Sequence, residues 1–186
     1  MLDTNNNILY IVFIVGLADC SRSSFVNFLQ QGYTVGVFVG GAHEAKYANP
    51  YPDIEILDLH RKNGFIRLAL MHQVPVVPVY TFNEVDIYTQ LSHTTIERIP
   101  LLSYALHVVN RVSGIIFVIS NLIPTPTHLT TVVGAPIHFD YVAGGREPTP
   151  SEIKAAKGVY VRALKTLYNQ YSPIYSSNKD RKLVIT

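Results

Sequence analysis

The sequence predicts an α/β fold in which helices flank a largely parallel sheet. Short runs of β-branched residues alternate along the chain with segments whose apolar residues recur at helical spacing. One of these runs is continuous and does not alternate with charged residues, as in strands buried on both faces of a parallel sheet. No repeat or linker interrupts the order, and 186 residues suffice for one domain with a sizeable core. We therefore expect a single domain over residues 1–186.

Three segments have the pattern of helices. Residues 21–33 place serines ahead of apolar residues at helical spacing and end near a glycine. Residues 63–73 repeat the spacing, and Asn63 stands where an N-cap is expected. Residues 149–171 form the clearest helix, with Ser151 as its predicted cap. Its predicted apolar stripe consists of Ile153, Val159, Val161, Leu164, Leu167 and Tyr168.

Three further segments have the pattern of strands. Residues 34–39 are a continuous apolar run, which predicts a strand buried on both faces. Residues 74–82 contain Pro75 and Pro78, which place this strand at a sheet edge or in irregular pairing. Residues 128–137 predict another strand, ended by a glycine.

The two most apolar segments are too short to cross a bilayer, which requires roughly 20 apolar residues. They are residues 8–18 and 113–124. We interpret the first as a buried strand or part of a helix.

Composition excludes several classes of protein. The net charge is +2, which is too small to indicate a nucleic-acid partner. The single Cys20 excludes a disulfide framework and fits a reducing compartment. Only 15% of the residues are charged, which indicates a large buried interior or a surface that meets lipid or a missing segment.

The predicted strand over 34–39 ends in a glycine pair, Gly40 and Gly41, followed closely by Glu44. Ligands of α/β sheets bind beyond the carboxyl ends of strands, and glycines there let backbone amides approach a ligand oxygen. Glu44 would then hold a hydroxyl or position a cation. A tight turn with a solvated glutamate explains the same residues. His43 has no partner at metal spacing and reads as a surface histidine.

Two basic groups precede predicted helices. Ser21 and Arg22 stand at a helix start, where free amides and a guanidinium favour an oxyanion, although a plain cap beside an exposed arginine fits equally. Arg61 and Lys62 follow His60 ahead of the next helix. They suit the phosphates of a nucleotide-like cofactor, or they form a solvated basic turn.

Taken in order, five blocks of this sequence resemble the C-terminal half of the type-2 diacylglycerol acyltransferase family. That family includes monoacylglycerol and wax-ester acyltransferases and is related to the wider glycerolipid acyltransferases. The resemblance runs from about residue 8 to about residue 172. Its blocks are GLADCSRSS, VGGAHEA, LHRKNGFIRLAL, VPVVPVYTFNEVDIYTQ and HLTTVVGAPI.

The resemblance assigns the acceptor-binding residues of the family to two of these blocks. Ser21 and Arg22 match a Ser-Arg block held to contact the polar part of the acceptor. Gly40, Gly41 and Glu44 match the Gly-Gly-Ala-x-Glu block, with Glu44 as a supporting residue.

The other blocks match with small departures. Arg61 and Lys62 match an Arg-Lys-Gly-Phe block, in which Asn63 intervenes here. Pro78 and Tyr80 match a Val-Pro-x-Tyr block. The family usually has a glycine after the phenylalanine that follows, and Asn83 takes its place.

The resemblance implies an O-acyltransferase with a glycerolipid-acyltransferase-like core. It would move a fatty acyl group from acyl-CoA to diacylglycerol or a related lipid alcohol, as in triacylglycerol synthesis. Acyl-CoA would be a co-substrate, with no cofactor and no metal. We expect the protein to work at a membrane surface, in the endoplasmic reticulum membrane.

One family motif has no match in this sequence. Family members carry a His-Pro-His-Gly motif upstream of the Ser-Arg block, and its histidine is taken to be the general base. The chain therefore resembles an N-terminally truncated member, and no catalytic residue is assigned within it. An alternative reading is a catalytically inactive fragment or pseudoenzyme that binds lipid or a partner.

Overall fold

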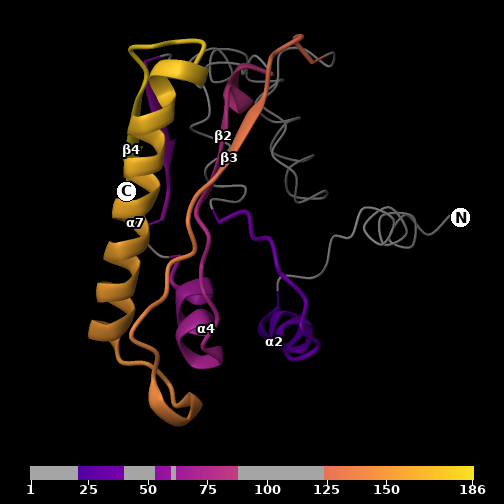
Figure 1. Cartoon of the computed structure of the whole chain (residues 1–186), viewed down its shortest axis with the longest axis vertical. Helices are drawn as coiled ribbons and strands as arrows, with labels where there is room; N and C mark the ends of the chain where they lie inside the picture. The colour runs from indigo at the N-terminus through magenta and orange to yellow at the C-terminus, as the bar shows by residue number, and fades with distance from the viewer. Residues whose placement is uncertain (1–20, 40–52, 60–61, 88–123) are drawn as a thin grey trace, which may run out of the picture. The chain divides into compact units, whose positions relative to one another are not determined.

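The computed structural model describes residues 21–39, 53–59, 62–87 and 124–186 (Figure 1). The chain divides into two compact units, Met1–Val37 and Phe38–Thr186. The described helices and strands are, in order, α2 (Arg22–Gln30), β1 (Ile54–Leu57), α4 (Gly64–His72), β2 (Val79–Phe82), the 3-10 turn η1 (Glu84–Asp86), β3 (Thr130–Val133), the 3-10 turn η2 (Ala143–Gly145), α7 (Pro150–Tyr175) and β4 (Lys182–Ile185). The apolar segment 8–18 and all but the last residue of segment 113–124 lie outside the described residues.

Helix α2 belongs to the first unit and confirms the helix predicted there. The Ser21 hydroxyl caps its start by accepting a bond from the Ser24 amide at 3.3 Å. Gly32, at φ 80°, ends it: its amide donates to the Leu29 carbonyl, and the Tyr33 amide to the Phe28 carbonyl, each at 3.0 Å. The Phe28 and Tyr33 rings meet edge-on at 6.0 Å. This pair of bonds with its apolar contact is a Schellman motif.

The strand predicted over residues 34–39 is wrong. The structure has no strand there, and Phe38 is 88% exposed. A β-branched run becomes a strand only when another strand supplies hydrogen bonds and packing. None of the described strands pairs with this segment.

The described strands form two pairs in the second unit. β1 and β4 are parallel, with Ile54 opposite Lys182. β2 and β3 are antiparallel, with Val79 opposite Val133. Mixed α/β structure is thus confirmed. We expected a largely parallel sheet, but the described strands form one parallel and one antiparallel pair.

The prolines shape the β2 pairing as predicted. β2 begins directly after Pro78, whose carbonyl accepts from the Gly134 amide at 2.8 Å. On the N-terminal side of Pro78, the described residues show a single isolated antiparallel bridge, between Val76 and Ile137. Proline has no amide hydrogen, so the ladder is interrupted where it stands.

Helix α4 lies where it was predicted, but Asn63 does not cap it with its side chain. The backbone of Asn63 is already in the helical region, at φ −102° and ψ −10°. A capping side chain needs extended backbone to reach back to the helix amides. The Asn63 side-chain oxygen instead accepts a hydrogen bond from Lys157 of α7 at 3.0 Å.

Helix α7 begins ahead of its predicted cap and ends beyond the predicted limit. Thr149, not Ser151, is its N-cap, and Thr149 and Glu152 form a reciprocal capping box. Pro150 is the first helical residue, which its fixed φ favours. The helix continues to Tyr175, whose ring stacks on Tyr171 with centroids 6.1 Å apart.

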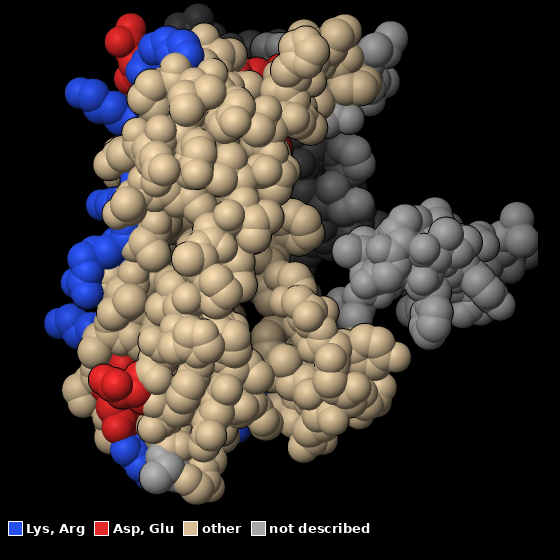
Figure 2. Space-filling model, in the orientation of Figure 1, with Lys and Arg blue, Asp and Glu red and all other residues tan. Residues whose placement is uncertain are grey.

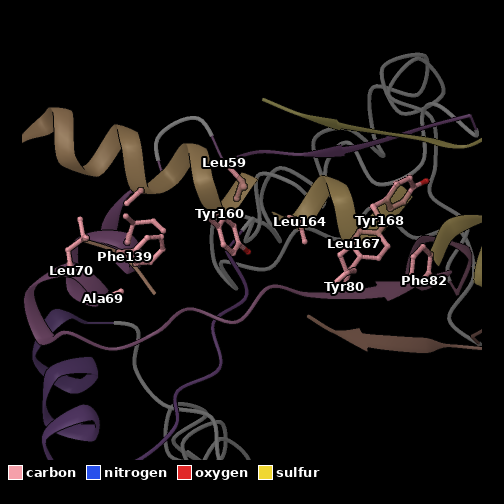
Figure 3. Close-up of a cluster of buried hydrophobic side chains, with 12 residues drawn as sticks. Leu59, Ala69, Leu70, Tyr80, Phe82, Phe139, Tyr160, Leu164, Leu167 and Tyr168 are labelled. Carbon is pink, nitrogen blue, oxygen red and sulfur yellow. The ribbon is translucent and has the colours of Figure 1, made fainter. Parts of the chain in front are cut away.

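The packed side of α7 forms the centre of the core (Figure 3). It contacts α4 and β2, and the Tyr168 and Tyr80 rings meet edge-on at 5.1 Å. Val159, expected in the apolar stripe, is instead 38% exposed. The buried residues of α7 are Ala156, Tyr160, Leu164, Leu167 and Tyr168.

Candidate functional site

The described part of the candidate site begins where β1 ends. Lys62 follows this parallel strand, and its amide donates to the Leu59 carbonyl at 3.1 Å. In α/β proteins ligands bind beyond the carboxyl ends of such strands. Lys62 therefore stands where the sequence predicted a basic group for an anion. Arg61 lies outside the described residues.

Lys157 of α7 contacts the same segment. Its ammonium donates to the carbonyl oxygen of Leu59 and to the side-chain oxygen of Asn63. Burial lowers the pKa of Lys157, against the opposing field of Asp58. In the sequence, Leu59 and Asn63 flank Arg61 and Lys62. Lys157 therefore binds the residues on both sides of this basic pair to α7.

The C-terminal strand fixes the end of β1 from the other side. The Leu59 amide donates to the Thr186 carbonyl at 2.8 Å, and the Thr186 amide donates to the Leu57 carbonyl at 3.0 Å. Helix α7 and strand β4 thus hold one strand end between them. A basic group on that end is positioned by backbone bonds as well as by Lys157.

Ser21 and Arg22 lie together at the start of α2. The Ser21 hydroxyl caps the helix and also bonds the Ser23 and Ser24 hydroxyls, each at 3.0 Å. Arg22 is exposed and lines a shallow depression along α2 with Val26 and Gln30. The predicted role of Ser21 as a helix cap is confirmed. Its contact with the lipid acceptor stays a prediction.

The remaining predicted site residues are Gly40, Gly41 and Glu44, which lie outside the described residues, as does His43. Ser21 and Arg22 belong to the first unit and Lys62 to the second.

A polar pair that the sequence analysis did not predict joins β1 to β2, with Tyr80 buried and Glu55 half-buried. The Tyr80 hydroxyl donates to the Glu55 carboxylate, and Tyr80 is only 6% exposed. Burial raises the pKa of Glu55, in spite of this bond and the nearby charge of Arg181. Burial and the carboxylate together raise the pKa of Tyr80. Tyr80 belongs to the Val-Pro-x-Tyr block, so its bond to Glu55 joins this block to β1.

An ion pair at the end of β2 ties the acidic turn to the C-terminal segment. Arg181 donates to the two carboxylate oxygens of Asp86 at 2.6 and 3.2 Å, and its side chain is 9% exposed. The Ser177 hydroxyl adds a bond to Asp86 at 2.6 Å. Burial alone would raise the pKa of Asp86, but these two donors hold it below its ordinary value.

Asn83 occupies the place of the family's usual glycine, and its backbone shows why a glycine fits. Its φ is 68°, in the left-handed region that glycine and asparagine tolerate best. Its amide nitrogen donates to the carbonyls of His128 at 2.9 Å and Tyr175 at 3.0 Å. Its oxygen accepts from the Ser177 amide at 2.8 Å. Asn83 thus supplies three bonds that glycine lacks.

In the ranges that the structure describes, no group of three or more histidine, cysteine or acidic side chains is placed to hold a metal ion. No helix in those same ranges combines the length and apolar character needed to cross a membrane.

Comparison with known proteins identifies the family. The family model for diacylglycerol acyltransferase matches residues 7–186. The chain is 34% identical to human 2-acylglycerol O-acyltransferase 3 over 167 residues, which cover 84% of this chain and 48% of that protein. It is 31% identical to Danio rerio diacylglycerol O-acyltransferase 2 over 182 residues, covering 91% of this chain and 49% of that protein.

A third relative shows the breadth of the family. Mouse acyl-CoA wax alcohol acyltransferase 2 is 30% identical over an aligned length of 193 residues, and the match covers 94% of this chain and 54% of that protein. The chain thus spans about half the length of the curated relatives it matches. No solved structure matches it. The resemblance seen in the five sequence blocks is confirmed, and the chain belongs to the diacylglycerol acyltransferase family.

Proposed function

We propose that the protein is an acyl-CoA-dependent O-acyltransferase that esterifies diacylglycerol or a related lipid alcohol. The observation that carries this proposal is the match of the diacylglycerol acyltransferase model to residues 7–186. The names of the relatives agree on the reaction class and differ in the acceptor, between acylglycerols and wax alcohols.

The reaction needs no redox step. The acceptor oxygen attacks the thioester carbonyl, the new C–O ester bond forms, and the C–S bond breaks. The hydroxyl proton passes to a general base, and the departing thiolate of CoA takes up a proton. By resemblance the base is the histidine of the family's His-Pro-His-Gly motif, and Glu44 has a supporting role.

We assign the acceptor to the two N-terminal blocks. Arg22 is exposed at the start of a capped helix, where a guanidinium and free amides attract the oxygen atoms of a polar headgroup. The resemblance adds Ser21 and the strand-end residues Gly40, Gly41 and Glu44. Glycines there would let the headgroup approach the backbone closely.

We assign the phosphates of acyl-CoA to Arg61 and Lys62. Support comes from the place of Lys62 beyond the carboxyl end of β1, and from the bonds by which Lys157 holds the segment. Acyl-CoA would be a co-substrate, and the reaction would require neither metal nor cofactor.

The cellular setting follows from the substrates. A lipid acceptor is available only at a membrane, so we propose that the protein works at a membrane surface, that of the endoplasmic reticulum by family resemblance. We further propose that residues 1–186 form one acyltransferase-like domain with a glycerolipid-acyltransferase-like core.

The test is a transfer assay with the full chain in membranes. Radiolabelled acyl-CoA is offered with diacylglycerol, monoacylglycerol or a long-chain alcohol, and the esters are separated by thin-layer chromatography. We expect product above a boiled control with at least one acceptor. Product at the boiled level with all three would reject the proposal; acyl-CoA binding without product would identify an inactive binding module.

Single substitutions separate the two binding roles. Lys62→Gln removes one charged contact to phosphate and should raise the KM for acyl-CoA roughly tenfold with little change in kcat. Arg22→Gln should instead raise the KM for the acceptor. Lys182→Gln makes the same chemical change at an exposed position of β4, outside both proposed binding groups, and serves as the matched control, with both KM values unchanged.

A further inference from the structure

The charge of this chain is divided unevenly along its length. Residues 153–186 contain seven Lys or Arg and one acidic residue. Residues 1–152 contain eight Lys or Arg and twelve acidic residues. The small net charge of +2 therefore combines an acidic larger part with a strongly basic C-terminal part.

Helix α7 presents much of this charge on one side. Successive residues turn by 100° around a helix, which places Lys154, Arg162 and Lys165 within one sector opposite the packed residues. All three are exposed. From Lys154 to Lys165 the row extends about 17 Å at 1.5 Å per residue. Figure 2 shows basic side chains spaced along the outer edge of α7. We call Lys154, Arg162 and Lys165 the basic face.

No carboxylate within the described residues neutralises the basic face. Ion pairs found in that part of the chain join other residues, among them Arg67 with Glu147, Arg146 with Glu152, and Arg181 with Asp86. Between Ile153 and Tyr175 the helix contains no Asp or Glu at all. A row of like charges repels itself, and an anionic partner would relieve that repulsion.

We propose that the basic face docks on an anionic lipid surface. Charge complementarity requires an anionic partner, and an extended row on a convex helix meets a plane of headgroups at all three positions together. The choice of lipid among anionic partners rests on the proposed function, whose acceptor is a membrane lipid. The apolar side of α7 is packed into the core, so the contact is electrostatic and the helix lies on the headgroups without inserting.

The strength of such a contact follows from the number of charges. Each Lys or Arg near an anionic bilayer strengthens binding roughly fivefold. Loss of all three should therefore weaken binding about 100-fold. The attraction is screened over a Debye length of about 8 Å at physiological salt, so binding should fall steeply as salt is added.

Vesicle flotation of the full chain tests the proposal. Vesicles of phosphatidylcholine with about one third phosphatidylserine are compared with pure phosphatidylcholine, each with wild type and with K154Q/R162Q/K165Q. The matched control K154R/R162K/K165R keeps three charges at the same positions. We expect flotation with anionic vesicles for wild type and the control, and about 100-fold weaker binding for the glutamine variant.

Three results would overturn the proposal: equal flotation with neutral vesicles, equal binding by the glutamine variant, or binding to a soluble acidic peptide but not to anionic vesicles. Acyl transfer in neutral detergent micelles is measured in parallel. Docking fails alone if the glutamine variant floats like wild type while the wild type is active in micelles. The proposed function fails alone if wild type floats as expected but forms no ester.

Discussion

Asn83→Asp offers a sharp test of the turn after β2. The two side chains are the same size and both tolerate the left-handed backbone found here, at φ 68°. The ionised carboxylate, however, has no donor for the carbonyls of His128 and Tyr175, which the native amide bonds at 2.9 and 3.0 Å. Since residue 83 is 8% exposed, water cannot easily replace either bond. Two part-buried acceptors lose their partner, which should cost about 1–3 kcal/mol of unfolding free energy.

Urea unfolding followed by circular dichroism measures this cost. The introduced carboxyl faces carbonyl oxygens, so its pKa in the folded state should be raised above that in the unfolded chain. The part of the cost that comes from ionisation is then absent below the unfolded pKa, about 3.9, and grows as pH rises through the folded value. A smaller deficit remains at low pH, because a protonated carboxyl has one donor for two carbonyls. Glu84→Gln, on an exposed neighbour, is the control and should change stability by less than about 0.5 kcal/mol. A deficit below that size at pH 7, or one that does not vary with pH, would refute the assigned bonds.

Three further substitutions test the packing around the site. Arg181→Met should destabilise by about 2–3 kcal/mol in urea unfolding, because it leaves Asp86 half-buried without its ion pair; additive effects with Asp86→Asn in a double-mutant cycle would contradict the pair. Gly134→Ala should cost about 1–3 kcal/mol, since a Cβ there would lie 2.8 Å from a leucine methyl carbon and 2.9 Å from a proline ring carbon; Gly64→Ala, with nothing within 4 Å, should be near neutral by the same measurement. Glu55→Gln should increase stability relative to wild type most at neutral pH. The raised pKa of Glu55 gives wild type a stability that is complete below pH 4.5, the ordinary pKa, and is lost as pH rises through the folded pKa. A stability difference that stays constant from pH 4 to pH 8 in urea unfolding would exclude this linkage.

The helices could be predicted because their signals are local. Apolar periodicity and end residues located α2, α4 and α7 within a few residues. The errors lie at the ends, where neighbouring residues compete to cap. Thr149 and Ser151 are both capping residues, and the proline between them decides in favour of Thr149 because proline fits the first helical position.

The strands were harder because pairing is not local. β1 and β4 have four residues each, and their register joins Ile54 to Lys182 across most of the described chain. Neither strand was predicted, since four residues carry too little alternation to stand out. Residues 34–39 carried a stronger pattern and form no strand, because a pattern reports residue type and cannot supply a partner.

The residues of the candidate site also fall into those that a local pattern can name and those that it cannot. Its residues could be named from short blocks such as Arg61–Lys62, because motifs are contiguous in sequence. The side chains that support the blocks could not, because their partners are distant: Lys157 contacts Asn63 across 94 positions and Arg181 contacts Asp86 across 95. No spacing rule links residues so far apart, and only the fold brings them together.

Net charge does not describe the local distribution of charge, because it is a sum over residues that lie far apart. Recognition depends on the field within about one Debye length, and there the two sides of α7 differ. Its packed side presents Lys157 to the segment that carries Lys62, and its outer side presents the basic face. Docking through that face would therefore place the lipid surface about one helix diameter, roughly 10 Å, from the strand end proposed to hold acyl-CoA. The same helix would then set both the geometry of the basic segment and its height above the membrane.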